Sequence, residues 1–324
     1  MLVSDDILFE KRGQAAIVML NREVALNAVT GAMVDALAEK LDEWETDDEV
    51  AHVVIRANGK AFSVGGDIRD LYRRRTDPDL DFFKREYRLN VRIKRYPKPY
   101  VALVHGLVMG GGVGVSLHGS HVVAGPNMAF AMPEVGIGFF PDVGATHLLP
   151  RLPGTLGMEL GLTGRRLMAD ECVGAGIAAY RADDVDGVLD RLCDHEVEAA
   201  LAPFATIGAV PSSHPAFEEE SVGEILDALG DDPLADTLRE KSPTSLMVAH
   251  RQLREGRELT FEDAMRLEYR IVSRILFGQD FYEGIRAQVI DKDREPRWSP
   301  PTLADVDTQS IAAHFAPLEH ELDL

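Results

Sequence analysis

Short runs of β-branched and other apolar residues alternate with helix-like stretches in the first half of this chain, and this alternation constrains its fold most. The runs at residues 17–20, 53–55, 100–104 and 122–124 predict buried strands. Between the first two runs, apolar residues recur at helical spacing over residues 31–44, and Thr30 is a suitable N-cap. Strands that alternate with helices predict an α/β fold with a parallel core.

Helical patterns replace the strand patterns in the second half of the chain. Helices are predicted at residues 186–200, 223–229, 242–255 and 261–277, and Thr260 is a suitable cap for the last of them. Residues 202–213 and 296–301, rich in proline, serine and small residues, predict connections. Two earlier helices are predicted at residues 80–94 and from the glycine run onward, where the second would carry Val113, Val115 and Leu117. We therefore predict a core at residues 1–200 and a helical C-terminal region at residues 201–324.

The balance of charge and the cysteine content limit the partners of this chain. Its formal net charge of −20 over 324 residues disfavours nucleic acids and anionic membrane surfaces, so a polyanionic ligand would need local cations or helix N-termini. No apolar run is long enough to predict a membrane span, and the acidic N-terminal residues do not predict a signal or transit peptide. Cys172 and Cys193 form no disulfide framework and lack metal-ligand spacing. These features predict a cytoplasmic protein.

Two glycine-rich segments each follow directly on a predicted strand. In the first, residues 60–68, Gly65 and Gly66 precede Asp67, so the turn either presents N–H groups to a ligand or is a tight turn that Asp67 caps. The second, residues 105–114, contains three consecutive glycines at the start of a predicted helix, where an anion or a developing oxyanion can approach closely. It lacks the Gly-Lys-Ser/Thr of a P-loop and the third glycine of a dinucleotide fingerprint.

Carboxylates in apolar surroundings are the other candidates for chemistry. Glu134 and Asp142 lie eight residues apart in an otherwise apolar segment, where their pKa values would rise and they could divide acid and base roles; the alternative is a pair of exposed turn residues. Glu86, within the predicted helix at residues 80–94, is by itself a solvated charge. His105, His118 and His147 have no local partner, which favours structural roles.

Taken together and in this order, these segments resemble the crotonase (enoyl-CoA hydratase/isomerase) superfamily. The resemblance rests on the Asn21-Arg22 and 25–28 segments, residues 61–67, residues 105–114 and residues 132–144. It implies a spiral of ββα repeats followed by a helical C-terminal region, and assembly as trimers or hexamers. It also implies a pair of backbone N–H groups, at Gly66 and Gly111, that holds the thioester carbonyl oxygen as negative charge develops on it.

Within the superfamily, the chain looks most like the hydrolase family that acts on 3-hydroxyisobutyryl-CoA. This closer resemblance is carried by residues 83–87, 110–119, 130–144 and 291–298. Hydratases of the superfamily use two glutamates to add water to a double bond. The first of them matches Gly114, which has no carboxyl group, and the second matches Glu134. By the same resemblance Asp142 and Glu86 belong to the active site, which makes hydrolysis of the thioester the expected reaction.

The resemblance also implies how the substrate is held. Glu134 would attack the thioester or activate water. Asp142 would orient the acyl hydroxyl or help to protonate the departing thiolate, and Glu86 would orient water or the substrate hydroxyl. Arg22 is the candidate cation for the coenzyme A phosphates, and Asp67 is a further candidate substrate contact. Coenzyme A enters as part of the acyl-CoA substrate, and no metal or separate cofactor is expected. The alternatives are an enoyl-CoA hydratase or isomerase and a non-catalytic acyl-CoA-binding protein.

Overall fold

Two units, each assembled from segments that are separate in the sequence, make up the computed structural model, which describes residues 5–324. The first unit contains the chain up to Gly66 together with Arg88–Ala131 and Arg166–Pro211. The second contains Asp67–Tyr87, Met132–Arg165 and Ser212–Leu324. The division at residue 200 stays a prediction from the sequence. No helix within residues 5–324 is long and apolar enough to span a bilayer.

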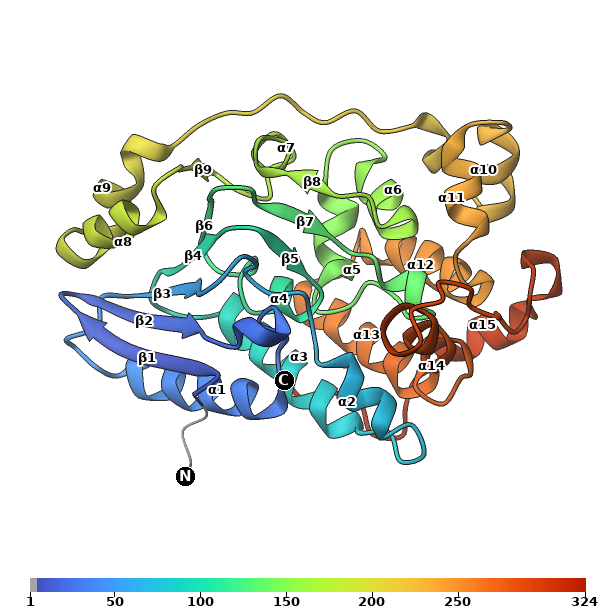
Figure 1. Ribbon diagram of the computed structural model, residues 1–324, viewed down its shortest axis with the longest axis horizontal. Coiled ribbons are helices and arrows are strands. Elements are labelled where there is room, and N and C mark those ends of the chain that lie inside the picture. Colours follow the sequence, from blue (N-terminus) through green and yellow to red (C-terminus); the bar gives the residue numbers. More distant parts are fainter. Residues whose placement is uncertain (1–4) are drawn as a thin grey trace. The chain divides into compact units, whose positions relative to one another are not determined.

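A six-stranded sheet forms the centre of the first unit (Figure 1). Its strands, in spatial order, are β1 (Ile7–Arg12), β2 (Ala15–Leu20), β3 (His52–Ala57), β4 (Tyr100–Val104), β6 (His121–Ala124) and β9 (Tyr180–Arg181). β1 pairs antiparallel with β2, and every later pairing is parallel, with Ile17 opposite Val54 and Ala102 opposite Val122. The four strands predicted from apolar runs are confirmed, as is the parallel α/β core.

Amphipathic helices pack their apolar faces against this sheet, which removes these faces from water. α1 (Gly31–Glu45) begins at the predicted cap, where the Thr30 hydroxyl accepts a hydrogen bond from the Met33 N–H at 3.3 Å. Its buried Trp44 meets the ring of Phe9 at 5.8 Å. α8 (Val185–Asp194) and α9 (Val197–Leu201) bury their apolar side chains in one cluster with residues of β2, β3, β4 and β6. The helix predicted at residues 186–200 is therefore two helices, because His195 adopts extended backbone angles between them.

A second, three-stranded sheet in the same unit orders the glycine-rich segment. It consists of β5 (Leu107–Met109), β7 (Ala129–Ala131) and β8 (Leu167–Met168), and α7 (Ala169–Gly174) follows it. α4 begins at Gly111 as predicted but ends already at Gly114. The predicted continuation through Val115 and Leu117 is wrong as regular helix, because the Ser116 N–H bonds three residues back to the Val113 carbonyl.

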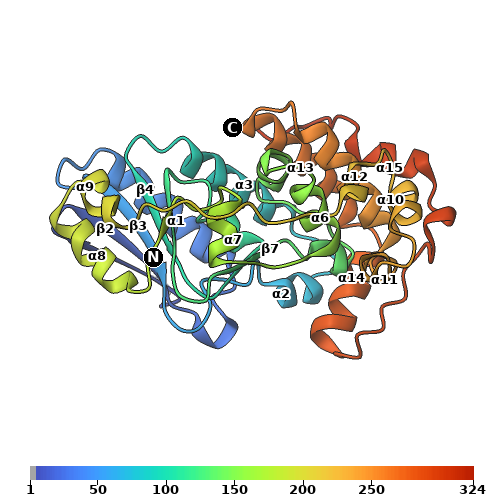
Figure 2. The same ribbon diagram turned by 90° about the horizontal axis from the view of Figure 1, so that it is seen from above.

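Helices dominate the second unit, as predicted for the C-terminal region (Figure 2). Its longest helices are α12 (Pro243–Gly256) and α13 (Phe261–Ile275), and α3 (Leu80–Lys94) contributes its first eight residues, up to Tyr87. Thr260 caps α13 as predicted, accepting from the Asp263 N–H at 3.1 Å. The others are α2 (Ile68–Arg73), α5 (Ala145–Leu148), α6 (Leu156–Thr163), α10 (Val222–Leu229), α11 (Pro233–Arg239), α14 (Asp280–Ile285) and α15 (Thr308–Phe315).

Candidate active site

The two glycine-rich segments run side by side in the first unit. The Ser63 N–H bonds to the Leu107 carbonyl at 3.1 Å, and the Met109 N–H bonds back to the Ser63 carbonyl at 3.0 Å. A Cβ atom placed on Gly65 would lie 3.7 Å from the Gly111 nitrogen. Among residues 5–324, neither the Gly66 N–H nor the Gly111 N–H has a hydrogen-bond partner. Two adjacent loops thus each offer a free backbone donor, which is the arrangement expected of an oxyanion hole.

Close packing between these loops explains their glycines. A Cβ atom on Gly112 would lie 2.7 Å from the Ser63 Cβ atom and 2.9 Å from its carbonyl oxygen. Gly65 has φ +104°, which residues with side chains rarely adopt. The Ser63 hydroxyl in turn donates to the Asn27 carbonyl at 2.8 Å. The Asn27 side chain donates to the Asn58 and Ala61 carbonyls at 2.8 and 2.9 Å, so the Asn-Arg segment supports the first glycine-rich turn.

The helices that follow the two donors are short. α2 has six residues and α4 has four, so the dipoles of these helices are small. The individual N–H groups are therefore the main feature of the two loops that could attract an anion. Asp67 is the N-cap of α2 and accepts from the Asp70 N–H at 3.3 Å. The cap alternative weighed for Asp67 is therefore confirmed, and its contact with substrate stays a prediction.

Among residues 5–324, six carboxylates are buried in the second unit, and three of them are the predicted ones. Glu86 on α3 is 2% exposed, Glu134 is 7% exposed and Asp142 is 5% exposed, so the alternative of exposed turn residues is wrong. Asp142 accepts a hydrogen bond of 2.9 Å from the Tyr87 hydroxyl. One oxygen of Glu86 and one of Glu134 have no partner within residues 5–324. Buried oxygens without a partner are costly, so these positions indicate a site for a ligand or water.

Aromatic side chains of the second unit form a cluster whose member Tyr87 contacts Asp142. Phe139 lies 4.7 Å from Phe140 and from Phe281, and 5.9 Å from Phe83, measured between ring centroids. Phe83 also meets Tyr87 edge-on at 6.1 Å. Rings in these positions exclude water, and the loss of hydration disfavours ionised carboxylates.

The pKa values of the acids rise accordingly. Burial first, and then the charge of Asp142, raises the pKa of Glu134 and of Glu86 well above the ordinary value. Burial raises the pKa of Asp142 to about 7, although the hydrogen bond from Tyr87 opposes the shift. A carboxyl group that changes protonation near neutral pH is suited to proton transfer.

Glu134 is held in place by unusually close backbone contacts. It begins a short 3-10 helix, η2 (Glu134–Ile137), that ends at Gly138 with φ +70°. A Cβ atom on Gly138 would lie 2.2 Å from the Asp280 carbonyl oxygen, and one on Gly284 would lie 2.3 Å from the Ile137 carbonyl carbon. Only glycines let η2 and α14 approach this closely, so α14 fixes the segment that carries Glu134.

A further buried carboxylate, which was not predicted from the sequence, is Glu268 of α13, which is fully buried. It accepts hydrogen bonds from the N–H groups of Gly144 and Thr146 at 2.8 and 3.0 Å. Burial and the charge of Asp142 raise its pKa to about 8. Its position could have revealed it, because it repeats at helical spacing with the buried residues Ala264, Ile271, Val272 and Ile275. An acid on an otherwise apolar helix face needs a partner or a function.

Asn90 is a second buried polar residue that was not predicted from the sequence. It lies one helical turn after Glu86 on α3, it is fully buried, and neither polar atom of its amide has a partner within residues 5–324. Gly114, the position that matches the first hydratase glutamate, is buried within α4 and brings no carboxyl group.

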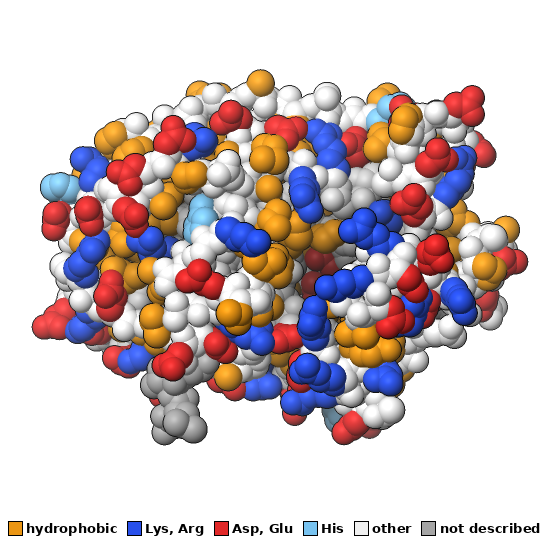
Figure 3. All heavy atoms as spheres, viewed as in Figure 1, with side chains coloured by type: hydrophobic (Ala, Val, Ile, Leu, Met, Phe, Trp, Pro, Cys, Tyr) orange, Lys and Arg blue, Asp and Glu red, His pale blue; other side chains and the backbone are white. Residues whose placement is uncertain are grey.

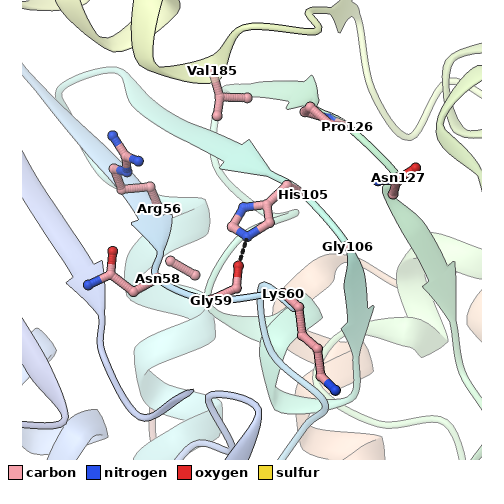
Figure 4. Close-up of a pocket in the computed structure, with 10 residues that line it drawn as sticks. Arg56, Asn58, Gly59, Lys60, His105, Gly106, Pro126, Asn127 and Val185 are labelled. Carbon is pink, nitrogen blue, oxygen red and sulfur yellow. Dashed lines mark hydrogen bonds between the residues drawn. The ribbon is translucent and has the colours of Figure 1, made fainter.

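Arg22, the predicted cation for the coenzyme A phosphates, is engaged within the first unit. It donates to the Ala28 carbonyl at 3.2 Å and lies 3.6 Å from a carboxylate oxygen of Asp6. A cavity of about 390 Å³ in the same unit offers other cations, and its lining includes Arg56, Lys60 and His105 (Figure 4). The His105 ring bonds to the Gly59 carbonyl at 2.8 Å, which confirms its structural role.

Arg56 and Lys60 differ in whether a neighbouring acid already neutralises their charge. Arg56 forms an ion pair of 2.7 Å with Asp186, whereas Lys60 is exposed and has no ion-pair partner within residues 5–324. Figure 3 shows lysine and arginine side chains among the acidic ones on one face of the protein, so cations are available to a polyanion despite the net charge of −20. Residues 5–324 contain no group of histidine, cysteine and acidic side chains that could hold a metal ion.

The free backbone donors of the first unit and the buried carboxylates of the second unit each agree with an enzyme of the crotonase type. The enoyl-CoA hydratase/isomerase family model matches residues 15–315, and the chain belongs to this family. A 3-hydroxyisobutyryl-CoA hydrolase, mitochondrial, from Danio rerio is 40% identical over 98% of this chain and 91% of its own length. The protein of the same name from Homo sapiens is 37% identical over 97% of this chain and 89% of its own length.

Solved structures agree with the predicted fold. A carnitinyl-CoA dehydratase from Mycobacterium thermoresistibile superposes with a TM-score of 0.91 at 37% identity, covering 99% of both chains. An enoyl-CoA hydratase from Rhodobacter sphaeroides has a TM-score of 0.88 at 38% identity and covers 98% of this chain and 100% of its own. The crotonase-like fold is thereby confirmed, as is the resemblance to the 3-hydroxyisobutyryl-CoA hydrolases.

Proposed function

We propose that this protein hydrolyses acyl-CoA thioesters, converting 3-hydroxyisobutyryl-CoA and water to 3-hydroxyisobutyrate and coenzyme A, a step of valine catabolism. The observation that carries the proposal is the set of acids: Glu134 and Asp142 are both buried, while Gly114 stands where a hydratase would have its other glutamate. The names of the relatives that match nearly the whole chain support the same reaction.

The proposed mechanism begins with the thioester carbonyl. The N–H groups of Gly66 and Gly111 hold its oxygen, and they hold it more strongly once it is an oxyanion. Loss of one such donor typically lowers a rate by about 10²–10³. Glu134 either attacks the carbonyl carbon to form an anhydride or removes a proton from an attacking water. In both routes the carbon–sulfur bond breaks and the electron pair leaves with the sulfur of coenzyme A.

Asp142 then supplies the proton that the leaving thiolate needs. A pKa raised to about 7 keeps much of Asp142 protonated near neutrality, and the leaving thiolate, whose conjugate thiol has a pKa of about 8.5, takes the proton readily. Water brings two protons: in the anhydride route both are released on hydrolysis, and in the direct route Glu134 takes one while the new carboxylic acid releases the other. One of the two restores Asp142, and the other goes to solvent. Glu86 orients water or the hydroxyl of the acyl group. Oxygen-18 from solvent entering the Glu134 carboxylate in a single turnover would support the anhydride route with water attacking the glutamyl carbon, and a carboxylate that stays unlabelled would exclude that form of the route.

The experiment that tests the function is release of free thiol from 3-hydroxyisobutyryl-CoA by the wild type, Glu134→Gln and Asp142→Asn. We expect wild-type turnover and loss of at least about 10² in kcat for each variant, within the range for positioned acid–base groups. Near-wild-type turnover by both variants would show that the site is assigned wrongly. A panel of acyl-CoAs in the same assay identifies the preferred acyl group.

Hydration of an enoyl-CoA is the second candidate, because the Rhodobacter sphaeroides structure that matches 98% of this chain is titled an enoyl-CoA hydratase. Crotonyl-CoA hydration, measured beside thiol release on the same preparation, separates the two reactions. Efficient hydration despite the missing carboxyl group at Gly114 would favour this candidate. Tight binding of acyl-CoA without either reaction would favour a binding protein instead.

Two cations are candidates for the phosphates of coenzyme A. Arg22 remains our prediction from the sequence, although part of its charge is offset by Asp6 at 3.6 Å. Lys60 is exposed and unpaired within residues 5–324, and it directly precedes the loop of the first donor. No cofactor besides the coenzyme A of the substrate is proposed.

Assembly and location are also proposals. A trimer or hexamer follows from the family resemblance alone and is tested by size-exclusion chromatography with light scattering. The relatives are named as mitochondrial proteins. Cys172 and Cys193 are buried free thiols that suit any reducing compartment, and the cytoplasm stays our prediction.

A further inference from the structure

The turn that carries Asp142 has an unfavourable backbone conformation. Val143 has φ 51° and Gly144 has φ 93°, so two successive residues occupy the left-handed region. Valine is β-branched and adopts this region rarely, whereas glycine adopts it freely. A conformation of this kind persists only where the surrounding structure holds it, and it is often found at functional sites.

Two helices of the second unit hold the turn from its flanks. The Glu268 carboxylate on α13 accepts the N–H groups of Gly144 and Thr146, one on each oxygen, and it also hydrogen-bonds to the Thr146 hydroxyl. The Gln252 amide on α12 donates to the Pro141 carbonyl at 2.5 Å and to the Thr146 hydroxyl at 2.7 Å. Pro141 before Asp142, and Gly144 and Thr146 after it, are therefore tied to side chains more than 100 positions later in the chain.

The choice of a carboxylate at position 268 needs a reason beyond filling space. Burial of a charge beside Asp142 is unfavourable, as the rise in the pKa of Glu268 to about 8 indicates. A leucine or methionine would suit an apolar helix face better but would leave two buried N–H groups without acceptors. A glutamine could accept only one of these N–H groups and would point its own N–H₂ at the other. Two oxygens that both accept are required to hold this turn.

We propose that Glu268 is a positioning residue for catalysis: by fixing the backbone of residues 141–146, it sets the direction in which the Asp142 carboxylate points. The fixed direction is visible in the hydrogen bond of 2.9 Å that Asp142 accepts from Tyr87. The inference rests on the proposed function, because it assumes that the Asp142 carboxylate takes part in turnover. Misplacement of a reacting group by about 1 Å can lower a rate by about 10².

Glu268→Gln tests the proposal, and Glu159→Gln is the matched control. Glu159 is also buried, at 3% exposed, and also accepts a backbone N–H, that of His214 at 2.7 Å, but the pKa values of the predicted site acids do not depend on it. For both variants, kcat and KM are measured by thiol release from 3-hydroxyisobutyryl-CoA, and folding is measured by the urea midpoint. Hydrogen–deuterium exchange of the peptide containing Gly144 and Thr146 reports the hold on the turn without any need for activity.

We expect Glu268→Gln to lower kcat by about 10- to 100-fold with KM within about threefold, and to speed exchange of that peptide. Glu159→Gln should keep wild-type kcat and exchange, whatever its urea midpoint. Wild-type kcat in folded Glu268→Gln would overturn the proposal. If Glu268→Gln does not fold, Glu268→Asp keeps both oxygens on a shorter side chain and is expected to show a smaller fall in kcat.

The remaining outcomes also decide the matter. Failure of both Glu268 variants to fold, beside a folded Glu159→Gln, would overturn the proposal, since Glu268 would then serve folding and not catalysis. If the wild type itself releases no thiol, the proposed function fails. The exchange measurement then decides separately whether Glu268 holds the turn, and unchanged exchange in Glu268→Gln would overturn that too.

Discussion

Replacing Asp142 by asparagine should abolish turnover and stabilise the fold, and the gain in stability should depend on pH. The ordinary pKa of an aspartate is about 3.9, and this value applies to the unfolded chain. In the folded protein burial raises the pKa of Asp142 to about 7. Asparagine keeps the shape and retains an oxygen that can accept the hydrogen bond from Tyr87, but it does not ionise.

The sign of the effect follows from proton binding. Below about pH 3.9 the carboxyl is protonated in both states, so its ionisation does not affect folding. Between about pH 4 and pH 7 the unfolded chain releases the proton while the folded protein keeps it, so the free energy of unfolding falls as the pH rises. Above pH 7 both states are ionised, and the full penalty applies. A difference of about three pH units corresponds to about 4 kcal/mol.

Urea denaturation of the wild type and Asp142→Asn at pH 4.5, 6 and 8 measures this penalty. We expect the stability advantage of the variant to be small at the lowest pH and to grow to about 2–4 kcal/mol at pH 8, the lower bound allowing for relaxation of the ionised site. The difference between the two proteins reports position 142 together with the neighbouring acids whose pKa values the charge of Asp142 raises. A stability difference that is the same at all three pH values, or a variant less stable than the wild type at pH 8, would refute the reasoning.

Three further predictions concern the acids, the donor loops and the cation. Glu134→Gln should lower kcat by at least about 10² with little change in KM, because it removes a group that acts on the reacting carbonyl and not one that holds coenzyme A; a matching rise in KM would contradict this. Gly112→Ala should lower kcat by about 10² or more, because the new Cβ atom would lie 2.7 Å from the Ser63 Cβ atom and would displace the first donor loop. Gly223→Ala is the control: its Cβ atom would meet only a serine oxygen at 3.9 Å, so kcat should not change. Lys60→Ala should raise KM for the acyl-CoA about tenfold but not KM for the acyl-pantetheine that lacks the nucleotide phosphates, and equal effects on both substrates would exclude a phosphate contact.

The sequence predicted those parts of the fold that depend on local pattern. The apolar runs at residues 17–20 and 100–104 identified strands, and α3 begins and ends at the predicted residues. Thr30 and Thr260 both cap helices as expected, because a cap depends only on a side chain and the N–H group three residues on. Such features depend only on residues that are close to one another in the sequence.

Features that depend on distant segments were predicted less well. The strands of the small sheet have two or three residues each and pair across up to 39 positions, so they leave no periodic signal. The helix that starts at Gly111 was predicted too long, because the 3-10 turn at Ser116 has no mark in the apolar pattern. Glu268 was missed because nothing next to it in the sequence shows that Gly144 and Thr146 lie against it.

The helical C-terminal region also has a larger part in the site than the sequence suggested. The division into a core at residues 1–200 and a helical region beyond it assigned every catalytic residue to the core. In the structure α12 and α13 provide Gln252 and Glu268, which hold the backbone on both sides of Asp142. α14 provides the backbone against which η2, and with it Glu134, is packed. A chain that ends at residue 200 would keep Glu134 and Asp142 but lose the contacts that hold both, so the acids of this site depend on the region beyond the predicted core.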